Sequence, residues 1–197
     1  MPVGGVSLRK SGAVIVDGRD GNDTITVDSQ LSMPRVLYGG TGNDTITGGN
    51  GPGILLGGDG NDTLNAGNGR DIVIGGAGQD TLNAGNGDDI LIAGSTSYDG
   101  RTAANLQALL CAIGREWLRN DLAYPARINH LTGVTPGGLN GTSYLKATAP
   151  GQTVFDDSGQ DRLTGSNGSD WFLLNLSGGT VLDRSDRTGS EVATDLQ

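Results

Sequence analysis

The sequence predicts an all-β fold built from short, regularly repeated strands, and three observations carry this prediction. Glycine is very frequent, at 36 of 197 residues. A glycine-rich motif returns every nine residues, and a large aliphatic residue stands at one fixed place in each copy. Dense glycine weakens helices and extended strands, because Gly loses more backbone entropy on folding than any other residue. The glycines therefore belong to turns that recur between short strands.

The nine-residue repeat reads G-G-x-G-x-D-x-U-x, where U is a large aliphatic residue. Its copies occupy residues 18–26, 39–47, 48–56, 57–65, 66–74, 75–83 and 84–92, with poorer copies at 9–17 and 27–38 and later copies at 156–164 and 165–173. The last three residues of a copy predict a short strand with its central side chain pointing inward, and the first six predict a turn. Stacked turns would bring carboxylates and carbonyls close together, which requires a cation between them.

This repeat resembles the calcium-binding nonapeptide of the RTX (hemolysin-type) family. The resemblance implies a parallel β-roll in which each Ca²⁺ lies between neighbouring turns of one edge. Sixth-position aspartates of both turns and backbone carbonyls would hold the ion. The sixth-position residues that we carry over as metal ligands are Asp23, Asp44, Asp62, Asp71, Asp80, Asp89, Asp161 and Asp170.

Two nonapeptides make one coil of such a roll, so the turns alternate between two edges. The first edge would stack the turns of Asp23, Asp44, Asp62 and Asp80, and the second edge those of Asp71 and Asp89. On the second edge Gly53 stands where an aspartate belongs, and residues 27–38 carry three extra residues. We therefore expect about two or three calcium sites on the first edge and about one on the second.

The outward strand positions predict two unlike faces. One sheet presents the Thr face, made of Thr24, Thr26, Thr45, Thr47, Thr63, Asn65, Thr81 and Asn83. The other presents the Ile/Leu face, made of Val36, Tyr38, Ile54, Leu56, Ile72, Ile74, Ile90 and Ile92. A long exposed apolar face tends to bind other apolar surfaces. We therefore expect the Ile/Leu face to be covered, either by another segment of this chain or by another chain.

Residues 99–119 predict an amphipathic helix that could provide this cover. Asp99 is the expected N-cap, and the apolar residues at helical spacing are Leu106, Leu109, Leu110, Ile113 and Trp117. The single cysteine, Cys111, is expected to be a small core residue of this helix. We expect the helix, or the segment after it, to pack on the Ile/Leu face.

The chain divides into one roll with an insertion. We expect a β-roll over 9–92, a helix-plus-loop insertion or cap over 93–152, returning roll turns over 153–184 and a frayed tail over 185–197. The part of the insertion from 120 to 152 is rich in Pro, Gly, Asn and Thr and predicts an ordered loop.

Charge and composition exclude several functions. The net charge of −9 and pI of about 4.3 argue against nucleic acid as a partner. Only Glu116 and Glu191 are glutamates among 22 acidic residues, which favours short carboxylate ligands for a hard cation. No apolar run is long enough to span a membrane. We assign no catalytic residue and expect no enzyme, since His130 is the sole histidine and is expected in a loop.

The resemblance implies a calcium-binding module of a secreted or surface-exposed bacterial protein. In that family the repeats stay unfolded at low cytoplasmic calcium for type I secretion, and external calcium folds them. Stretches such as GSTSYD, VFDD and DWF resemble the C-terminal module of large secreted calcium-binding bacterial proteins. The N-terminus lacks the apolar region of a secretory signal, so we expect either another export route or an excised fragment.

Three alternatives remain open. The chain could be the secretion and folding tail of an exported enzyme, or an adhesin or ice-binding segment, with carbohydrate or surface binding through the Thr face. It could also be a protein that self-assembles through the Ile/Leu face. The outward turn residues vary from repeat to repeat, which argues against ice binding. Any protein or surface partner is unknown at this level.

Overall fold

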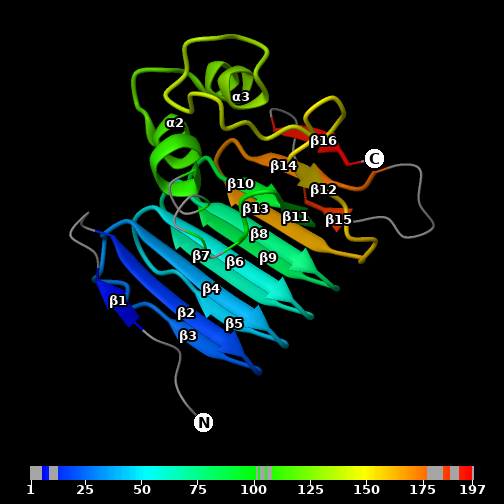
Figure 1. Cartoon of the computed structure of the whole chain (residues 1–197). Helices are drawn as coiled ribbons and strands as arrows, with labels where there is room; N and C mark the ends of the chain where they lie inside the picture. Colours follow the sequence, from blue (N-terminus) through cyan, green and yellow to red (C-terminus); the bar gives the residue numbers. More distant parts are fainter. Residues whose placement is uncertain are drawn as a thin grey trace.

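The computed structural model describes residues 6–8, 13–100, 102, 105, 108–176, 184–186 and 191–196. Two sheets of mostly parallel strands face one another, as the stacked arrows in Figure 1 show. The fold is the predicted all-β parallel β-roll, with a helical segment against one of its faces.

The larger sheet has eight strands in the order β1-β2-β4-β6-β8-β10-β14-β16. Their bounds are β1 Val6–Leu8, β2 Val14–Asp20, β4 Arg35–Thr41, β6 Gly53–Asp59, β8 Ile72–Ala77, β10 Ile90–Ile92, β14 Trp171–Leu174 and β16 Val192–Asp195. Neighbouring strands are parallel except for β1, which pairs antiparallel with β2. This sheet carries the Ile/Leu face.

The smaller sheet has six strands in the order β15-β13-β9-β7-β5-β3. Their bounds are β3 Thr24–Thr26, β5 Thr45–Thr47, β7 Thr63–Asn68, β9 Thr81–Asn86, β13 Arg162–Asn167 and β15 Arg184–Ser185. Successive repeats are in register, so that Ile46 pairs with Leu64 and Leu64 with Leu82. Thr24, Thr26 and Thr45 on the Thr face are exposed.

Many strands are longer than the predicted three residues, because the first glycines of the following turn also pair. Gly40 pairs with Gly58, and Gly67 pairs with Gly85. The glycines at these places have positive φ, 115° at Gly58 and 108° at Gly67. Only glycine adopts this conformation without strain, so the turns stack as closely as the strands do.

The roll resumes after the insertion. The short antiparallel pair β11 (Ser95–Thr96) and β12 (Val154–Phe155) brings the two ends of the insertion together. After it β13 pairs with β9, and β14 pairs with β10. The frayed tail expected from residue 185 onward is wrong in part, because β16 pairs with β14 and Leu196 is buried.

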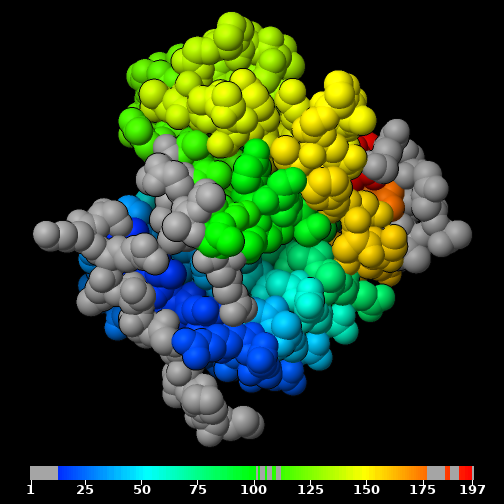
Figure 2. Space-filling view, viewed as in Figure 1, coloured from blue at the N-terminus to red at the C-terminus, as the bar shows by residue number. Residues whose placement is uncertain are grey.

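Two apolar cores lie on opposite sides of the larger sheet. The inner core between the sheets contains the inward ladder Ile46, Leu55, Leu64, Val73, Leu82 and Leu91, continued by Leu163 and Phe172. The outer core joins the Ile/Leu face to the helical segment, through Leu109, Ile113, Trp117, Ile128 and Leu131. The predicted packing of the helix and loop on this face is therefore confirmed. In Figure 2 this segment, in green to yellow, lies directly against the roll.

The helical cover differs in detail from the single predicted helix. Its described residues form a π-helical turn, η1 (Ala108–Ile113), and helix α2 (Gly114–Leu118). The carboxylate of Asp99 accepts the N–H of Thr96 at 2.6 Å, and the Oγ1 atom of Thr102 accepts the N–H of Asn105 at 3.2 Å. The first turn of the predicted helix, which Asp99 was expected to cap, lies largely outside the described residues. Leu106 and the side chains of Leu110 and Cys111 lie outside the described residues. Among the described helices none is long and apolar enough to cross a membrane.

The predicted loop after this helix contains a second helix, α3 (Tyr124–Thr132), which carries His130. Pro125 stands in the first turn of α3 and Gly133 ends it with φ of 77°, an N-terminal proline and C-terminal glycine typical of helix boundaries. The apolar spacing in this stretch is weak, so tertiary contacts decide its structure.

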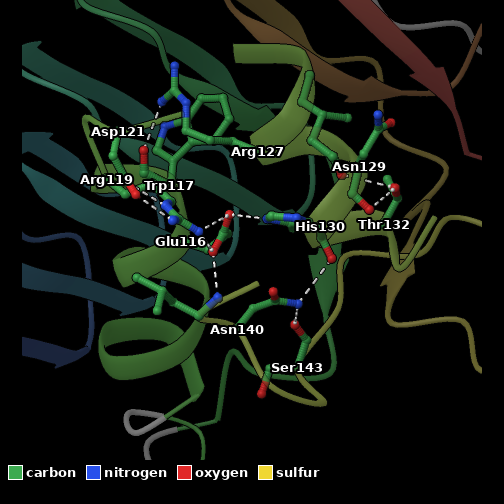
Figure 3. A network of polar contacts seen from close by, with 12 residues as sticks. Glu116, Trp117, Arg119, Asp121, Arg127, Asn129, His130, Thr132, Asn140 and Ser143 are labelled. Atoms are coloured by element: carbon green, nitrogen blue, oxygen red, sulfur yellow. Dashed lines mark hydrogen bonds and ion pairs between the residues drawn. The ribbon is translucent and has the colours of Figure 1, made fainter. Parts of the chain in front are cut away.

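A buried carboxylate joins the parts of the cover, as Figure 3 shows. The side chain of Glu116 is fully buried, and its oxygens lie 2.6 Å from His130 Nδ1 and 2.5 Å from the backbone nitrogen of Leu139. Arg119 also donates to Glu116, at 3.2 Å. These partners hold the pKa of Glu116 below its ordinary value despite burial. His130 therefore lies in a helix rather than in a loop.

Candidate metal centre

The sixth-position aspartates of the first edge form a continuous column. In each turn the Oδ1 atom of the aspartate accepts the backbone N–H of the sixth-position residue in the preceding turn. The nitrogen to oxygen distances are 2.7 Å from Asp23 to Asp44, 2.7 Å from Asp44 to Asp62, 2.8 Å from Asp62 to Asp80 and 2.6 Å from Asp80 to Asp161. Asp161 thus joins this column across the insertion.

The second edge repeats the arrangement with fewer carboxylates. The corresponding distances are 2.5 Å from Gly53 to Asp71, 2.7 Å from Asp71 to Asp89 and 2.8 Å from Asp89 to Asp170. Every aspartate predicted as a ligand therefore lies in one of two columns, and the insertion interrupts neither. At Gly53 the column has no side-chain oxygen.

The second carboxylate oxygen is the unusual feature of these aspartates. In Asp23, Asp62, Asp71, Asp89 and Asp170 the Oδ2 atom is buried and has no hydrogen-bond partner among the described residues. Buried polar atoms almost always have a partner, because losing water without a replacement is costly. Because the same buried Oδ2 atom lacks a hydrogen-bond partner in several turns, we infer that a cation binds beside it.

A cradle for such a cation lies next to the first-position glycines of the first edge. A Cβ atom added to Gly57 would overlap both Asp62 Oδ2 and the carbonyl oxygen of Gly75 in the next turn. The same two kinds of oxygen flank Gly39 and Gly75. A carboxylate oxygen and a carbonyl oxygen from successive turns thus converge on a space that a side chain would fill.

On the second edge, side chains fill part of the space beside the first position of the repeat. Two of its repeats, 66–74 and 84–92, begin with Ala66 and Ala84 instead of glycine, and both alanines are buried. Gly165 keeps the glycine, and a Cβ atom there would overlap Asp170 Oδ2. The two edges therefore share the sixth-position aspartates, but the second edge keeps a first-position glycine only in some of its turns.

Burial makes these carboxylates reluctant to ionise. It raises the pKa of Asp62 to about 6, that of Asp71 and Asp170 to about 7, and that of Asp89 to about 9. The backbone N–H bonds lower these pKa values, whereas neighbouring carboxylates such as Asp71 beside Asp89 raise them. A bound cation would favour the ionised carboxylates and so would lower the raised pKa values again.

The donor set suits a hard cation held largely by the backbone. Among the described residues no three carboxylate, imidazole or thiol groups converge on one point. Each position between turns instead offers one or two carboxylates together with peptide carbonyls. Oxygen ligands of this kind are typical of Ca²⁺, and the arrangement does not resemble the nitrogen and sulfur sites of zinc.

Sequence reasoning missed two members of the second edge. Arg35 pairs with Gly53, and therefore takes the sixth position in the irregular repeat 27–38. Glu191 directly precedes Val192, which pairs with Trp171, so it continues the column beyond Asp170. The triplet V-L-Y after Arg35 was the available signal, because an aspartate precedes the equivalent triplet in most other repeats.

Comparison with known families agrees with this geometry. A family model described as RTX calcium-binding nonapeptide repeat (4 copies) matches residues 10–30, 36–51, 56–91 and 152–176. These ranges include most of the two columns and leave out the helical cover. No curated protein and no solved structure matches the chain.

Proposed function

This chain belongs to the RTX calcium-binding nonapeptide repeat family, and we propose that its two aspartate columns bind several Ca²⁺ ions that fold and stabilise the roll. The ligands would be Asp23, Asp44, Asp62, Asp80 and Asp161 on the first edge, with Asp71, Asp89 and Asp170 on the second. Backbone carbonyls of adjacent turns would complete each site.

One observation carries the proposal. Asp62 uses Oδ1 to accept the N–H of Asp44, while its buried Oδ2 has no hydrogen-bond partner among the described residues and lies beside the Gly57 cradle. The first oxygen ties two turns together, and the second is left for a cation. A bound ion would screen the repulsion between stacked carboxylates and connect consecutive turns.

We place this module outside the cell or at the bacterial cell surface, as part of a secreted protein exported by a type I system. Extracellular calcium modules bind at roughly 10⁻⁴ to 10⁻³ M. Such affinity would leave the columns empty in a low-calcium cytoplasm and fill them outside. The role is structural and not catalytic, and the chain could equally serve as the folding tail of an exported enzyme.

Burial or exposure of the two faces bears on two alternatives, self-assembly through the Ile/Leu face and surface binding through the Thr face. The Ile/Leu face is buried under the helical cover, with Ile54, Ile72 and Ile90 all at most 4 % exposed, so it is not free for self-assembly. The Thr face stays open, and surface binding through it is the remaining adhesin option.

A calcium titration tests the proposal. Metal-free protein is titrated with Ca²⁺ while β-structure is followed by far-ultraviolet circular dichroism, with Mg²⁺ as the competing ion and chelator to reverse the change. We expect a cooperative gain of β signal at roughly 0.1–1 mM Ca²⁺. Asp62→Asn should raise the calcium midpoint by about tenfold, because one charged ligand is lost.

The matched control is Asp59→Asn in the same repeat. Asp59 is exposed and lies outside the columns, so its variant should keep the wild-type midpoint. A wild-type chain that is fully folded in chelator and indifferent to Ca²⁺ would contradict the proposal, as would equal midpoints for the two variants.

A further inference from the structure

Arg35 occupies a place in the second edge where the later turns have acids. Strand β4 begins at Arg35, which pairs with Gly53, and Gly53 in turn donates its N–H to Asp71 at 2.5 Å. Counted from strand β2, the column therefore reads Val14, Arg35, Gly53, Asp71, Asp89 and Asp170. Arg35 is its first charged residue, and the next turn has no side chain at this position.

The guanidinium of Arg35 binds the backbone of two successive turns. Its Nη1 atom donates to the carbonyl oxygen of Asn50 at 2.6 Å, and its Nη2 atom donates to that of Gly51 at 2.6 Å. Longer contacts reach the carbonyl oxygens of Met33 at 3.3 Å and Leu31 at 3.4 Å. Arg35 is fully buried. A positive charge thus lies inside a cage of peptide oxygens, which is the environment that a hard cation requires.

The empty side-chain position at Gly53 gives the guanidinium its room. A Cβ atom added to Gly53 would lie 3.2 Å from Arg35 Nε and 3.2 Å from Asp71 Oδ1. These distances show that Arg35 Nε and Asp71 Oδ1 both border the space that a side chain at position 53 would occupy. An aspartate at position 53, as in the other turns, would crowd both groups. The buried guanidinium of Arg35 therefore depends on the absence of a side chain at Gly53.

Arg35 also supplies charge to the column. Asp71 and Arg35 attract one another, and a guanidinium stays charged at any pH at which the protein is folded. It bridges carbonyls of neighbouring turns and faces a carboxylate, which are the two tasks of a metal ion in a stacked roll.

We propose that the Arg35 guanidinium is a built-in cation that takes the place of a metal ion near the N-terminal end of the second edge. The position between the turns of residues 27–38 and 48–56 binds no calcium, and Arg35 connects these two turns in its place. The inference rests on the proposed function, because it states where the calcium columns end.

Counting bound ions tests whether the position beside Arg35 binds no calcium. Equilibrium dialysis with ⁴⁵Ca²⁺ compares the wild-type chain with the double variant Arg35→Ala/Gly53→Asp. Removing the guanidinium and restoring the aspartate should create the missing site, so the double variant should bind one more Ca²⁺ per chain. An unchanged number of ions would overturn the proposal.

Urea unfolding at saturating Ca²⁺ tests whether Arg35 stabilises the roll where calcium does not bind. Arg35→Gln should lower the urea midpoint by about 1 M, because buried carbonyls lose a charged donor that calcium does not replace. The matched control is Arg162→Gln, since Arg162 is an exposed arginine and its variant should keep the wild-type midpoint. Equal midpoints for the two variants would overturn the proposal.

Arg35→Lys keeps the test decisive if the glutamine variant does not fold. Lysine retains the charge without the planar donors, so its midpoint should lie between those of the wild type and a neutral variant. A lysine variant that also fails to fold would contradict a role for the charge. If neither the wild type nor the double variant binds Ca²⁺, the proposed function fails, and the urea comparison still decides whether Arg35 holds the turns.

Discussion

At the scale of single residues, the sixth-position aspartate divides its two oxygens between two tasks. The Oδ1 atom of Asp71 accepts the N–H of Gly53, which fixes the turn, and the Oδ2 atom is buried without a hydrogen-bond partner among the described residues. Aspartate takes this position in eight turns, and Glu191 takes the equivalent position after Asp170.

The raised carboxylate pKa values predict how the metal-free roll responds to pH. Asp71 and Asp170 titrate near 7 in the folded chain, but near 4 when unfolded. The folded state therefore holds more protons between these limits. The stability that these two groups contribute is full below pH 4 and falls as pH rises to about 7. Thermal unfolding of dialysed, metal-free protein at pH 4.5 and 7.5 should show the higher midpoint at pH 4.5.

Saturating calcium provides the control for this pH dependence. Bound ions replace the protons on the same carboxylates, so the loss of stability between pH 4.5 and 7.5 should disappear or reverse. A metal-free midpoint that rises with pH would show that the buried carboxylates are not the groups that titrate.

The first-position glycines lead to a second residue-scale prediction. In Gly57→Ala the added methyl group enters the cradle between Asp62 and the Gly75 carbonyl. We expect a loss of about 1–3 kcal/mol in the free energy of unfolding, by overpacking, and a weaker calcium midpoint in circular dichroism. Ala66→Gly, at the same position on the second edge, is the matched control and should not weaken calcium binding. Equal calcium midpoints for the two variants would exclude the cradle.

At the scale of elements, the helical cover decides which face of the roll meets water. Trp117 of α2 is fully buried in the outer core, and its Nε1 atom donates to the carbonyl oxygen of Asp88 at 2.9 Å. Arg127 of α3 stacks on this ring at 4.6 Å and pairs with Asp88. The cover is therefore attached to the turn that precedes Asp89 as well as to the Ile/Leu face.

Removing the Trp117 ring should detach part of this cover. We expect Trp117→Ala to cost about 3–5 kcal/mol in the free energy of unfolding and to increase the binding of a hydrophobic dye, because the Ile/Leu face becomes accessible. Urea unfolding and dye fluorescence measure the two effects. Val134→Ala is the control, since Val134 is 71 % exposed, and a similar result for both variants would argue against the cover.

At the scale of the whole molecule, the C-terminal strands close the roll. Strands β13 and β14 pair with β9 and β10 across the insertion, and they bring Phe172 and Leu174 into the inner core. They also supply Asp161 and Asp170, the partners of Asp80 and Asp89. In a stacked fold each turn depends on its neighbours, so these strands, together with β15 and β16 at the sheet edges, act as the C-terminal cap.

A chain ending at residue 152 tests this role. It would expose the edges of β9 and β10 together with one end of the inner core. We expect a lower urea midpoint in saturating Ca²⁺ than for the full chain, and association of the truncated chains in size-exclusion chromatography. A truncated chain that stays monomeric with an unchanged midpoint would show that the cap is dispensable.

The fold and most of the candidate ligands were predictable from local pattern alone. The nine-residue period placed Asp44, Asp62 and Asp80 at one register, and that register is the one observed. The apolar spacing of Leu109, Ile113 and Trp117 likewise predicted a cover for the Ile/Leu face. Helix α3 was not predictable, because the apolar spacing of this stretch is weak and the helix depends on contacts such as that between His130 and Glu116.

The sequence by itself determined the repeating unit, the two columns and the two unlike faces, because each depends only on which residues recur at a fixed spacing. Only the tertiary structure decided what happens where the spacing breaks. Residues 27–38 contain extra residues, and only strand pairing shows that Arg35 stands in the column. The return of Asp161 and Asp170 to their columns likewise depends on contacts between segments that are 81 residues apart.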